Sequence, residues 1–483
     1  MRTNTLLSPL TPIQLLQASF FFLLAFILTL HALLSSTSTF LLSPKMASFV
    51  SQNRAAFVSL LFCSLVLLLL YIYNRRSREV LLLDYSCYLP DTDQKCSFEV
   101  SQYFVKRSRR FSKKSEEFMR GIYLKSGLGD ETYAPPFIFQ TDYEAKLKSA
   151  IQEAEEGMFS AVDALLSKAN VAVSDIDVLI VTCGSFTSCP SLSSILINHY
   201  GFRETIASYN LTGMGCSSGA ASIDLAGRIL SSSRRIRYAL VVITESISLN
   251  WYFGDNRSML VTNCIFRVGT AAALLTNDPA RRGGAKMVLT RALRTHCGAD
   301  DAAHHAAYQE EDEEGQMGIA LTKDLIRVAG EGLRTHIRSL APKVLTWGQL
   351  AQHAWHVAAG WAKREGKPHV PDFTQAFEHV CVHTGGKAVI EAVSRILRFD
   401  ESVTEPARMT LHRFGNTSSS LIFYELAYFE AKGRIKKGDK VWMMAFGTGF
   451  KVCSLVWTSL KDSCLDADNP WKDCIHRYPV KAW

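Results

Sequence analysis

The sequence lacks the cysteine spacing that marks a disulfide scaffold or a zinc site. Its twelve cysteines are spread irregularly over 483 residues, and no two of them form a CxxC pair. Small secreted domains held by disulfides are much denser in cysteine, and structural zinc sites need closely spaced ligand pairs. The thiols are therefore expected to be reduced, as in a cytosolic compartment, and no metal site is predicted.

Charge is missing altogether from two stretches near the N-terminus. Residues 13–34 and 55–73 contain no Asp, Glu, Lys or Arg. A helix rises about 1.5 Å per residue, so each run is of the length that crosses a hydrocarbon core about 30 Å thick. A cleaved signal peptide is the alternative, but the first run is long, its basic flank is only Arg2, and a second run follows at once. Two transmembrane helices are therefore predicted within a membrane anchor, residues 1–79.

The charges that flank these runs predict an orientation. Arg75, Arg76 and Arg78 follow the second run, whereas the loop between the runs carries only Lys45 and Arg54. Because positive charges stay on the cytosolic side, the rest of the chain is expected to face the cytosol.

A second basic stretch, residues 105–114, lies beyond the predicted anchor. It is either a solvated face or a contact with anionic lipid headgroups. The aromatic residues do not interleave with the basic ones as in nucleic-acid modules, so no nucleic-acid partner is expected.

From about residue 141 the pattern alternates between helix and buried strand. Helical periodicity covers 145–169, 320–340, 388–397 and 421–433, and apolar runs typical of strands cover 176–186, 238–248, 270–277, 379–386 and 439–450. This alternation predicts a layered α/β domain with a largely parallel sheet. Residues 80–140 are interpreted as a connecting segment, and the acidic run 310–314 as a solvated loop.

A repeated spacing indicates that the α/β unit is duplicated. Cys183 stands at the end of a strand 33 residues before Cys216, and His383 ends a strand 33 residues before Asn416. In both halves the later residue stands in a turn of small residues that opens a helix. Two such halves, 141–300 and 301–483, packed face to face would bring the two turns together.

The two turns carry side chains suited to acyl chemistry. Glycines and serines surround Cys216, which leaves room for an acyl group, and the start of a helix favours a thiolate over a thiol. The Asn416 amide can donate hydrogen bonds but cannot act as a base. Taken singly, each residue is more readily structural, and a Cys–His pair is also a signal of hydrolytic enzymes such as proteases.

The stretches around these residues resemble the 3-ketoacyl-CoA synthases of the plant-type fatty acid elongase. These enzymes are membrane-anchored relatives of chalcone synthase and of ketoacyl-acyl-carrier-protein synthase III. The resemblance covers nearly the whole chain from about residue 80, and its motifs are 213–217, 257–269, 294–301, 308–315, 378–390, 409–420 and 446–454. The residues at Ser218, Thr270, Thr448 and Val452–Cys453 differ from the family's commoner ones, which leaves the preferred chain length open.

The resemblance implies a thiolase-like fold, with a duplicated five-layer αβαβα core behind the two transmembrane helices. It implies a catalytic triad of Cys216, His383 and Asn416. It further implies an oxyanion hole built from the backbone N–H groups of Cys216 and Thr448, and supporting roles for three other histidines, which are His296, His379 and His412.

The implied activity is that of a very-long-chain 3-oxoacyl-CoA synthase. Its substrates are a long-chain acyl-CoA and malonyl-CoA, without any further cofactor. The expected setting is a homodimer in the endoplasmic reticulum membrane, with membrane lipid and the other elongase subunits, the reductases and the dehydratase, as partners. A chalcone-type polyketide synthase and a catalytically silent elongase scaffold are the alternatives.

Overall fold

The computed structural model describes residues 64, 78–140, 144–363 and 370–481, and the chain divides into two units, 1–77 and 78–483. The predicted transmembrane helices at 13–34 and 55–73 lie outside the described residues, apart from Ser64. Among the residues that are described, no helix is both long enough and apolar enough to cross a bilayer. The fold is therefore that of the second unit.

A mixed sheet of nine strands runs through this unit. The strand order is β3-β2-β4-β5-β1-β6-β11-β10-β9, and a separate hairpin pairs β7 with β8. The strands are β1 (Leu81–Cys87), β2 (Ile176–Cys183), β3 (Ala207–Thr212), β4 (Tyr238–Glu245), β5 (Gly269–Thr276), β6 (Met287–His296), β7 (Ala307–Glu311), β8 (Met317–Leu321), β9 (His379–Val382), β10 (Lys440–Gly447) and β11 (Lys451–Ser459).

The sheet contains the same arrangement twice. In the first half β2 is parallel to β4, and β4, β5 and β1 follow as antiparallel neighbours. In the second half β9 is parallel to β10, and β10, β11 and β6 follow in the same antiparallel way. The counterpart of β3 is replaced in the chain by a helix, α14 (Glu401–Phe414). The two halves join where β1 pairs with β6.

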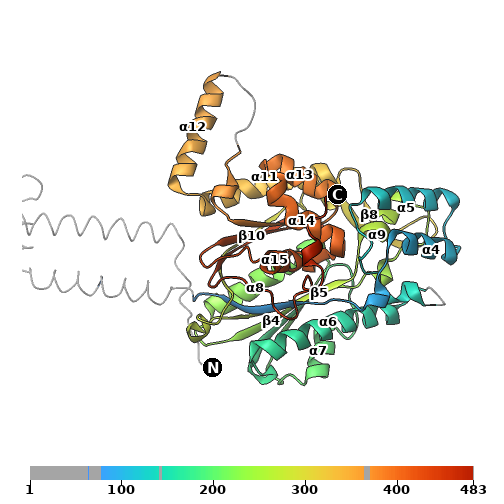
Figure 1. Cartoon of the computed structure of the whole chain (residues 1–483), viewed down its shortest axis with the longest axis horizontal. Helices are drawn as coiled ribbons and strands as arrows, with labels where there is room; N and C mark the ends of the chain where they lie inside the picture. Colours follow the sequence, from blue (N-terminus) through green and yellow to red (C-terminus); the bar gives the residue numbers. More distant parts are fainter. Residues whose placement is uncertain (1–63, 65–77, 141–143, 364–369, 482–483) are drawn as a thin grey trace, which may run out of the picture. The chain divides into compact units, whose positions relative to one another are not determined.

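Helices cover both outer faces and fill the space between the halves. The helices are α4 (Phe98–Ser108), α5 (Lys113–Lys125), α6 (Leu147–Ala169), α7 (Leu192–Tyr200), α8 (Ser218–Ser232), α9 (Arg257–Ile265), α10 (Asp301–His304), α11 (Leu325–Val344), α12 (Trp347–Lys363), α13 (Lys387–Leu397), α14 and α15 (Leu421–Ala431). Figure 1 shows α8 and α15 between β4 and β10, with α6 and α7 outside one half and α11, α13 and α14 outside the other. Every residue of α15 from Leu421 to Glu430 is buried, as expected for a helix that is apolar on all sides.

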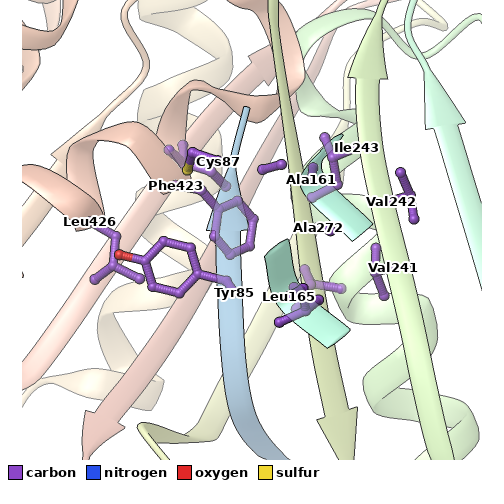
Figure 2. Packing of buried hydrophobic residues seen from close by; sticks show 14 of the residues in the cluster. Tyr85, Cys87, Ala161, Leu165, Val241, Val242, Ile243, Ala272, Phe423 and Leu426 are labelled. Atoms are coloured by element: carbon purple, nitrogen blue, oxygen red, sulfur yellow. The ribbon is translucent and has the colours of Figure 1, made fainter. Parts of the chain in front are cut away.

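The interpretation of residues 80–140 as a connecting segment is wrong. Strand β1 lies between β5 and β6 and is buried along its whole length except at the half-buried Leu83–Asp84 bulge region. Figure 2 shows Tyr85 and Cys87 of β1 beside Phe423 and Leu426 of α15, while Ala161 and Leu165 of α6 lie at the other face of the sheet. This strand therefore packs against helices of both halves.

The acidic run 310–314 is also different from the prediction. Glu310 and Glu311 belong to strand β7, whose partner β8 pairs Glu311 with Met317. The side chains of both glutamates are exposed, so the composition gave the solvation correctly but not the strand. Alternation of exposed and buried residues in β8 lets this hairpin form one wall of the cavity described below.

Candidate active site

A cavity of about 380 Å³ opens at the carboxyl ends of β2, β4, β9 and β10. Cys216, His383 and Asn416 all line it, so the three residues predicted from the sequence meet in one place. Open α/β sheets bind ligands at this end of their strands. The residues come from both halves of the chain, as the duplicated spacing predicts.

Cys216 lies in a 3₁₀ turn, Gly215–Ser217, that leads into α8. The turn packs against the end of β10 so closely that side chains have no room. A methyl carbon at Gly215 would lie 2.9 Å from the backbone nitrogen of Thr448, and one at Gly447 would lie 2.6 Å from Ser217 Cβ. Gly215 also has a φ of 53°, which favours glycine. Close packing of these two turns therefore explains the small residues around the thiol.

The thiolate predicted for Cys216 is not favoured in the structure. Burial raises the pKa of the Cys216 thiol to about 12, and the negative charge of Glu245 raises it further, whereas the Ser418 hydroxyl lowers it. The turn points backbone N–H groups toward the cavity, but desolvation of a charged sulfur outweighs that gain. Cys216 is therefore a neutral thiol that needs a proton acceptor when it attacks.

His383 follows directly after β9 and is only 5% exposed. Burial lowers the pKa of its imidazole to about 3, so the ring is neutral at physiological pH. Its Nδ1 has no hydrogen-bond partner among the described residues, and the ring packs edge-on against Phe446 with the centroids 5.8 Å apart. A neutral imidazole in a cavity wall can donate an N–H hydrogen bond to a ligand oxygen.

Asn416 is fixed by contacts that cross between the halves. Its backbone N–H donates to Ile265 O at 3.1 Å, and its carbonyl accepts from Arg267 N at 2.9 Å. The side-chain Oδ1 accepts a hydrogen bond from Ser418 N at 2.8 Å, and Nδ2 donates to Gly385 O at 3.3 Å. With Oδ1 occupied, the Nδ2 group has its second N–H left for a ligand in the cavity.

The predicted oxyanion hole also lies at this cavity. Thr448 lines it, and the turn 448–450 between β10 and β11 faces the Cys216 turn. The Thr448 hydroxyl donates a hydrogen bond to Gly213 O at 3.5 Å, which ties the two turns together. The pairing of backbone N–H groups from Cys216 and Thr448 stays a prediction about the bound state.

None of the three predicted supporting histidines lines the cavity. His296 is exposed at the end of β6, where its Nδ1 accepts from Gly298 N at 2.9 Å. At the opposite end of β9 from the cavity, His379 bonds Asp439 Oδ2 at 2.9 Å. In α14, His412 Nδ1 bonds the Tyr478 hydroxyl at 3.2 Å. These contacts suit structural roles, because each ring is engaged with protein groups away from the cavity.

The positions that depart from the commoner family residues lie mostly away from the cavity. Of Ser218, Thr270, Thr448, Val452 and Cys453, only Thr448 lines it. Thr270 is buried in β5, where its hydroxyl bonds the Thr244 hydroxyl at 2.7 Å. These departures therefore change packing behind the site more than the wall that a substrate meets.

Sequence reasoning missed two residues that touch the catalytic group. The Ser418 hydroxyl lies 3.4 Å from Cys216 Sγ and 2.7 Å from Glu245 Oε2. Glu245 ends the apolar strand β4 and is 3% exposed. A lone carboxylate at the end of a buried strand needs partners, and that was the available signal. No sequence signal marks Ser418 among its serine neighbours.

Two family models match the chain. Residues 72–360 match "FAE1/Type III polyketide synthase-like protein", and residues 374–459 match "3-Oxoacyl-[acyl-carrier-protein (ACP)] synthase III C terminal". Among curated relatives, 3-ketoacyl-CoA synthase 17 of Arabidopsis thaliana is 44% identical over 89% of this chain and 88% of its own length. The 3-ketoacyl-CoA synthase 11 of the same plant is 46% identical over 88% of this chain and 84% of its own.

Solved structures share the fold at low sequence identity. A polyketide synthase, PKS-I, of the brown alga Ectocarpus siliculosus superposes with a TM-score of 0.63 at 17% identity, covering 80% of this chain and 99% of that one. The 1,3,6,8-tetrahydroxynaphthalene synthase of Streptomyces coelicolor gives 0.60 at 19% identity, with 79% and 99% covered. The thiolase-like α/β fold predicted from the sequence is confirmed.

Proposed function

The chain belongs to the 3-ketoacyl-CoA synthase family, and we propose that it condenses malonyl-CoA with a long-chain acyl-CoA through an acyl group held on Cys216. One observation carries this proposal, which is that a single cavity brings together a thiol, a neutral imidazole and an amide from the two halves of the chain. Those groups match the needs of a thioester exchange followed by a decarboxylative condensation.

The first half-reaction is loading of the acyl chain. The sulfur of Cys216 attacks the thioester carbonyl of the acyl-CoA, and CoA leaves as the acyl chain is transferred to Cys216. Charge that develops on the carbonyl oxygen needs donors at the turn, for which the backbone N–H groups of Cys216 and Thr448 are the proposed pair. The apolar side chains Ile319, Leu321 and Leu325 line the same cavity and suit a hydrocarbon chain.

The second half-reaction is decarboxylation of malonyl-CoA and carbon–carbon bond formation. Loss of CO2 leaves an enolate at the thioester, and its oxygen needs hydrogen-bond donors. His383 and Asn416 are the proposed donors, because a neutral imidazole and an amide each offer an N–H. The enolate carbon then attacks the acyl carbonyl on Cys216, which gives a 3-oxoacyl-CoA longer by two carbons. An asparagine fits this role better than hydrolysis, where an aspartate would orient a base.

The experiment that tests the nucleophile is acyl trapping with a labelled long-chain acyl-CoA. Wild-type chain is expected to retain the label and, with malonyl-CoA, to release the extended product, whereas Cys216→Ala is expected to do neither. Cys264→Ala is the matched control, because that buried thiol lies in α9 and its Sγ donates to Leu260 O at 3.4 Å, away from the cavity. Label that persists in Cys216→Ala would overturn the assignment.

We further propose that the chain is held in the endoplasmic reticulum membrane by the two predicted transmembrane helices, with the catalytic unit in the cytosol. The uncharged runs and the arginines at 75, 76 and 78 support this placement. A homodimer and contact with the reductases and dehydratase of elongation complete the proposed setting. Protease added outside sealed microsomes is expected to digest residues 80–483, and their survival would show the orientation to be wrong.

A further inference from the structure

The thiol of Cys216 is connected to a buried carboxylate through one hydroxyl. Ser418 Oγ lies 2.7 Å from Glu245 Oε2 and 3.4 Å from Cys216 Sγ. A serine hydroxyl has a single hydrogen, and the shorter bond to the charged acceptor takes it. The Cys216 S–H is then left to donate to the free lone pair of Ser418. The three groups therefore form a chain of hydrogen bonds that runs from the thiol to the carboxylate.

The backbone of Ser418 is held in a strained conformation that sets this hydroxyl in place. Its φ is 56°, in the left-handed region that residues with a side chain rarely adopt. Asn416 Oδ1 accepts from Ser418 N at 2.8 Å, and Ser418 is 1% exposed. Strain of this kind costs on the order of 1–3 kcal/mol and is found chiefly at functional sites. Ser418 also lies in the turn that leads into α15, the counterpart of the Cys216 turn before α8.

Glu245 is built into the cavity wall by neutral donors. Its carboxylate accepts from Gly184 N at 3.0 Å, from Ser185 N at 2.9 Å and from the Ser185 hydroxyl at 2.6 Å. The Cys183 thiol is a further neutral neighbour, 3.3 Å from Oε1. These bonds fix the position of the carboxylate without the positive partner that a structural ion pair would supply.

We propose that Ser418 and Glu245 form the proton path for Cys216, with Ser418 as a catalytic residue and Glu245 as the positioning residue and proton store behind it. The proposal rests on the acyl-cysteine function above. During loading, the sulfur–carbon bond to the acyl group forms while the Cys216 proton passes to Ser418 and the Ser418 proton passes to Glu245. The carbon–sulfur bond to CoA breaks, and the CoA thiolate takes a proton from water.

The condensation step returns the proton. The enolate carbon bonds to the acyl carbon, the bond from that carbon to Cys216 breaks, and the sulfur leaves as a thiolate. Ser418 then gives its proton to the sulfur and recovers one from Glu245. Over a full cycle one proton from solvent ends on the released CoA, and the site is back in its starting state.

This path leaves His383 free for the second half-reaction. Its pKa of about 3 makes the imidazole a poor acceptor for a thiol proton, and its Nδ1 is without a partner among the described residues. With a thiol pKa of about 12, only roughly one Cys216 in 10⁵ is ionised at pH 7, so the free thiolate alone is scarce. A connected acceptor removes that limit.

The test is the pH profile of single-turnover acylation in wild-type chain and in Ser418→Ala. With an internal acceptor, the wild-type rate is expected to change little between about pH 6.5 and 8.5. In Ser418→Ala the rate at pH 7 is expected to fall roughly 10²-fold and to rise about tenfold per pH unit, because the proton must leave to hydroxide. A variant profile that is lower but parallel to wild type would overturn the proposal.

Two further variants separate a proton path from a structural effect. Ser419→Ala removes a neighbouring buried hydroxyl that has no partner in the described part of the chain, and it is expected to keep the wild-type profile. Glu245→Gln is expected to show the same steep profile as Ser418→Ala, and the double variant is expected to be no slower than either single one. A flat profile in Glu245→Gln would overturn the proposal.

Decarboxylation of malonyl-CoA gives the remaining control. In a Cys216→Ala background the thiol proton is gone, so adding Ser418→Ala is expected to leave the decarboxylation rate unchanged. A loss there would show that Ser418 acts through Asn416 instead, and the proton path would be refuted. Failure of wild-type chain to form any acyl-enzyme would refute the proposed function itself, which keeps the two results distinguishable.

Discussion

Replacing Gly447 with alanine should damage catalysis by moving the turn that carries Cys216. The added methyl carbon would collide with Met214 O and lie 2.6 Å from Ser217 Cβ, whereas real contacts of this kind essentially never fall below 3.0 Å. The Cys216 turn must therefore move by at least about 0.4 Å, the difference between those two values. The φ of Gly447 lies outside the left-handed region, so crowding is the whole effect.

The expected magnitude follows from that displacement. A shift of about 1 Å in a reacting group costs on the order of 10²-fold in rate. If the logarithm of the rate scales with distance, 0.4 Å corresponds to roughly a sixfold loss of acylation. Overpacking of a buried contact adds a destabilisation of about 1–3 kcal/mol. Loss of rate is expected to exceed loss of folded protein, since the clash is at the nucleophile itself.

The assay is acyl-enzyme formation after rapid mixing, with thermal unfolding measured on the same samples. Gly283→Ala is the matched control, because its methyl group meets nothing within 4 Å and its backbone needs no positive φ. That variant is expected to acylate and unfold as the wild type does. Wild-type acylation by Gly447→Ala would refute the idea that close packing of the two turns positions Cys216.

The remaining predictions concern Asn416 and His336. Asn416→Asp should slow malonyl-CoA decarboxylation by roughly 10²–10³ while acylation of Cys216 is less affected, because a donor becomes an acceptor that repels the enolate; equal loss in both assays would contradict this division. His336 lies 2.8 Å from both the Thr295 and Ser454 hydroxyls, and burial lowers its pKa to about 4. His336→Gln should cost about 1–3 kcal/mol in denaturant unfolding near pH 7.5. Because the folded pKa lies below the unfolded value of 6.5, wild-type chain loses stability as pH falls from 6.5 to 4, and the difference between the two proteins should shrink by up to about 1.4 kcal/mol per pH unit.

The alternation of strands and helices in the two halves could be predicted because each element has a local pattern. The apolar runs at 238–248 and 439–450 contain β4 and β10, and the spacing from Cys183 to Cys216 reflects the same strand-to-turn path as that from His383 to Asn416. Residues that end a strand or open a helix carry this signal within a window of a few residues. The cavity then follows from the topology, since both turns lie at the carboxyl ends of parallel strands.

The features that could not be predicted depend on partners distant in sequence. Strand β1 is short, and its neighbours β5 and β6 begin about 190–200 residues later in the chain, so no local pattern marks it as central. The state of the Cys216 thiol depends on how completely the folded chain removes water from it, which outweighs the nearby helix start. The position of Ser418 depends on a positive φ imposed by the Asn416 side chain.

The place of β1 in the sheet determines where a soluble catalytic fragment can begin. A fragment that starts at residue 78 keeps the ladder from β5 through β1 to β6 intact. One that starts at residue 141, at the visible onset of the α/β pattern, would leave β5 and β6 with unpaired edges and strip Phe423 of its contact with Tyr85. Such a fragment would contain Cys216, His383 and Asn416 and yet lose the strand that joins their two halves, so it should aggregate rather than turn over substrate.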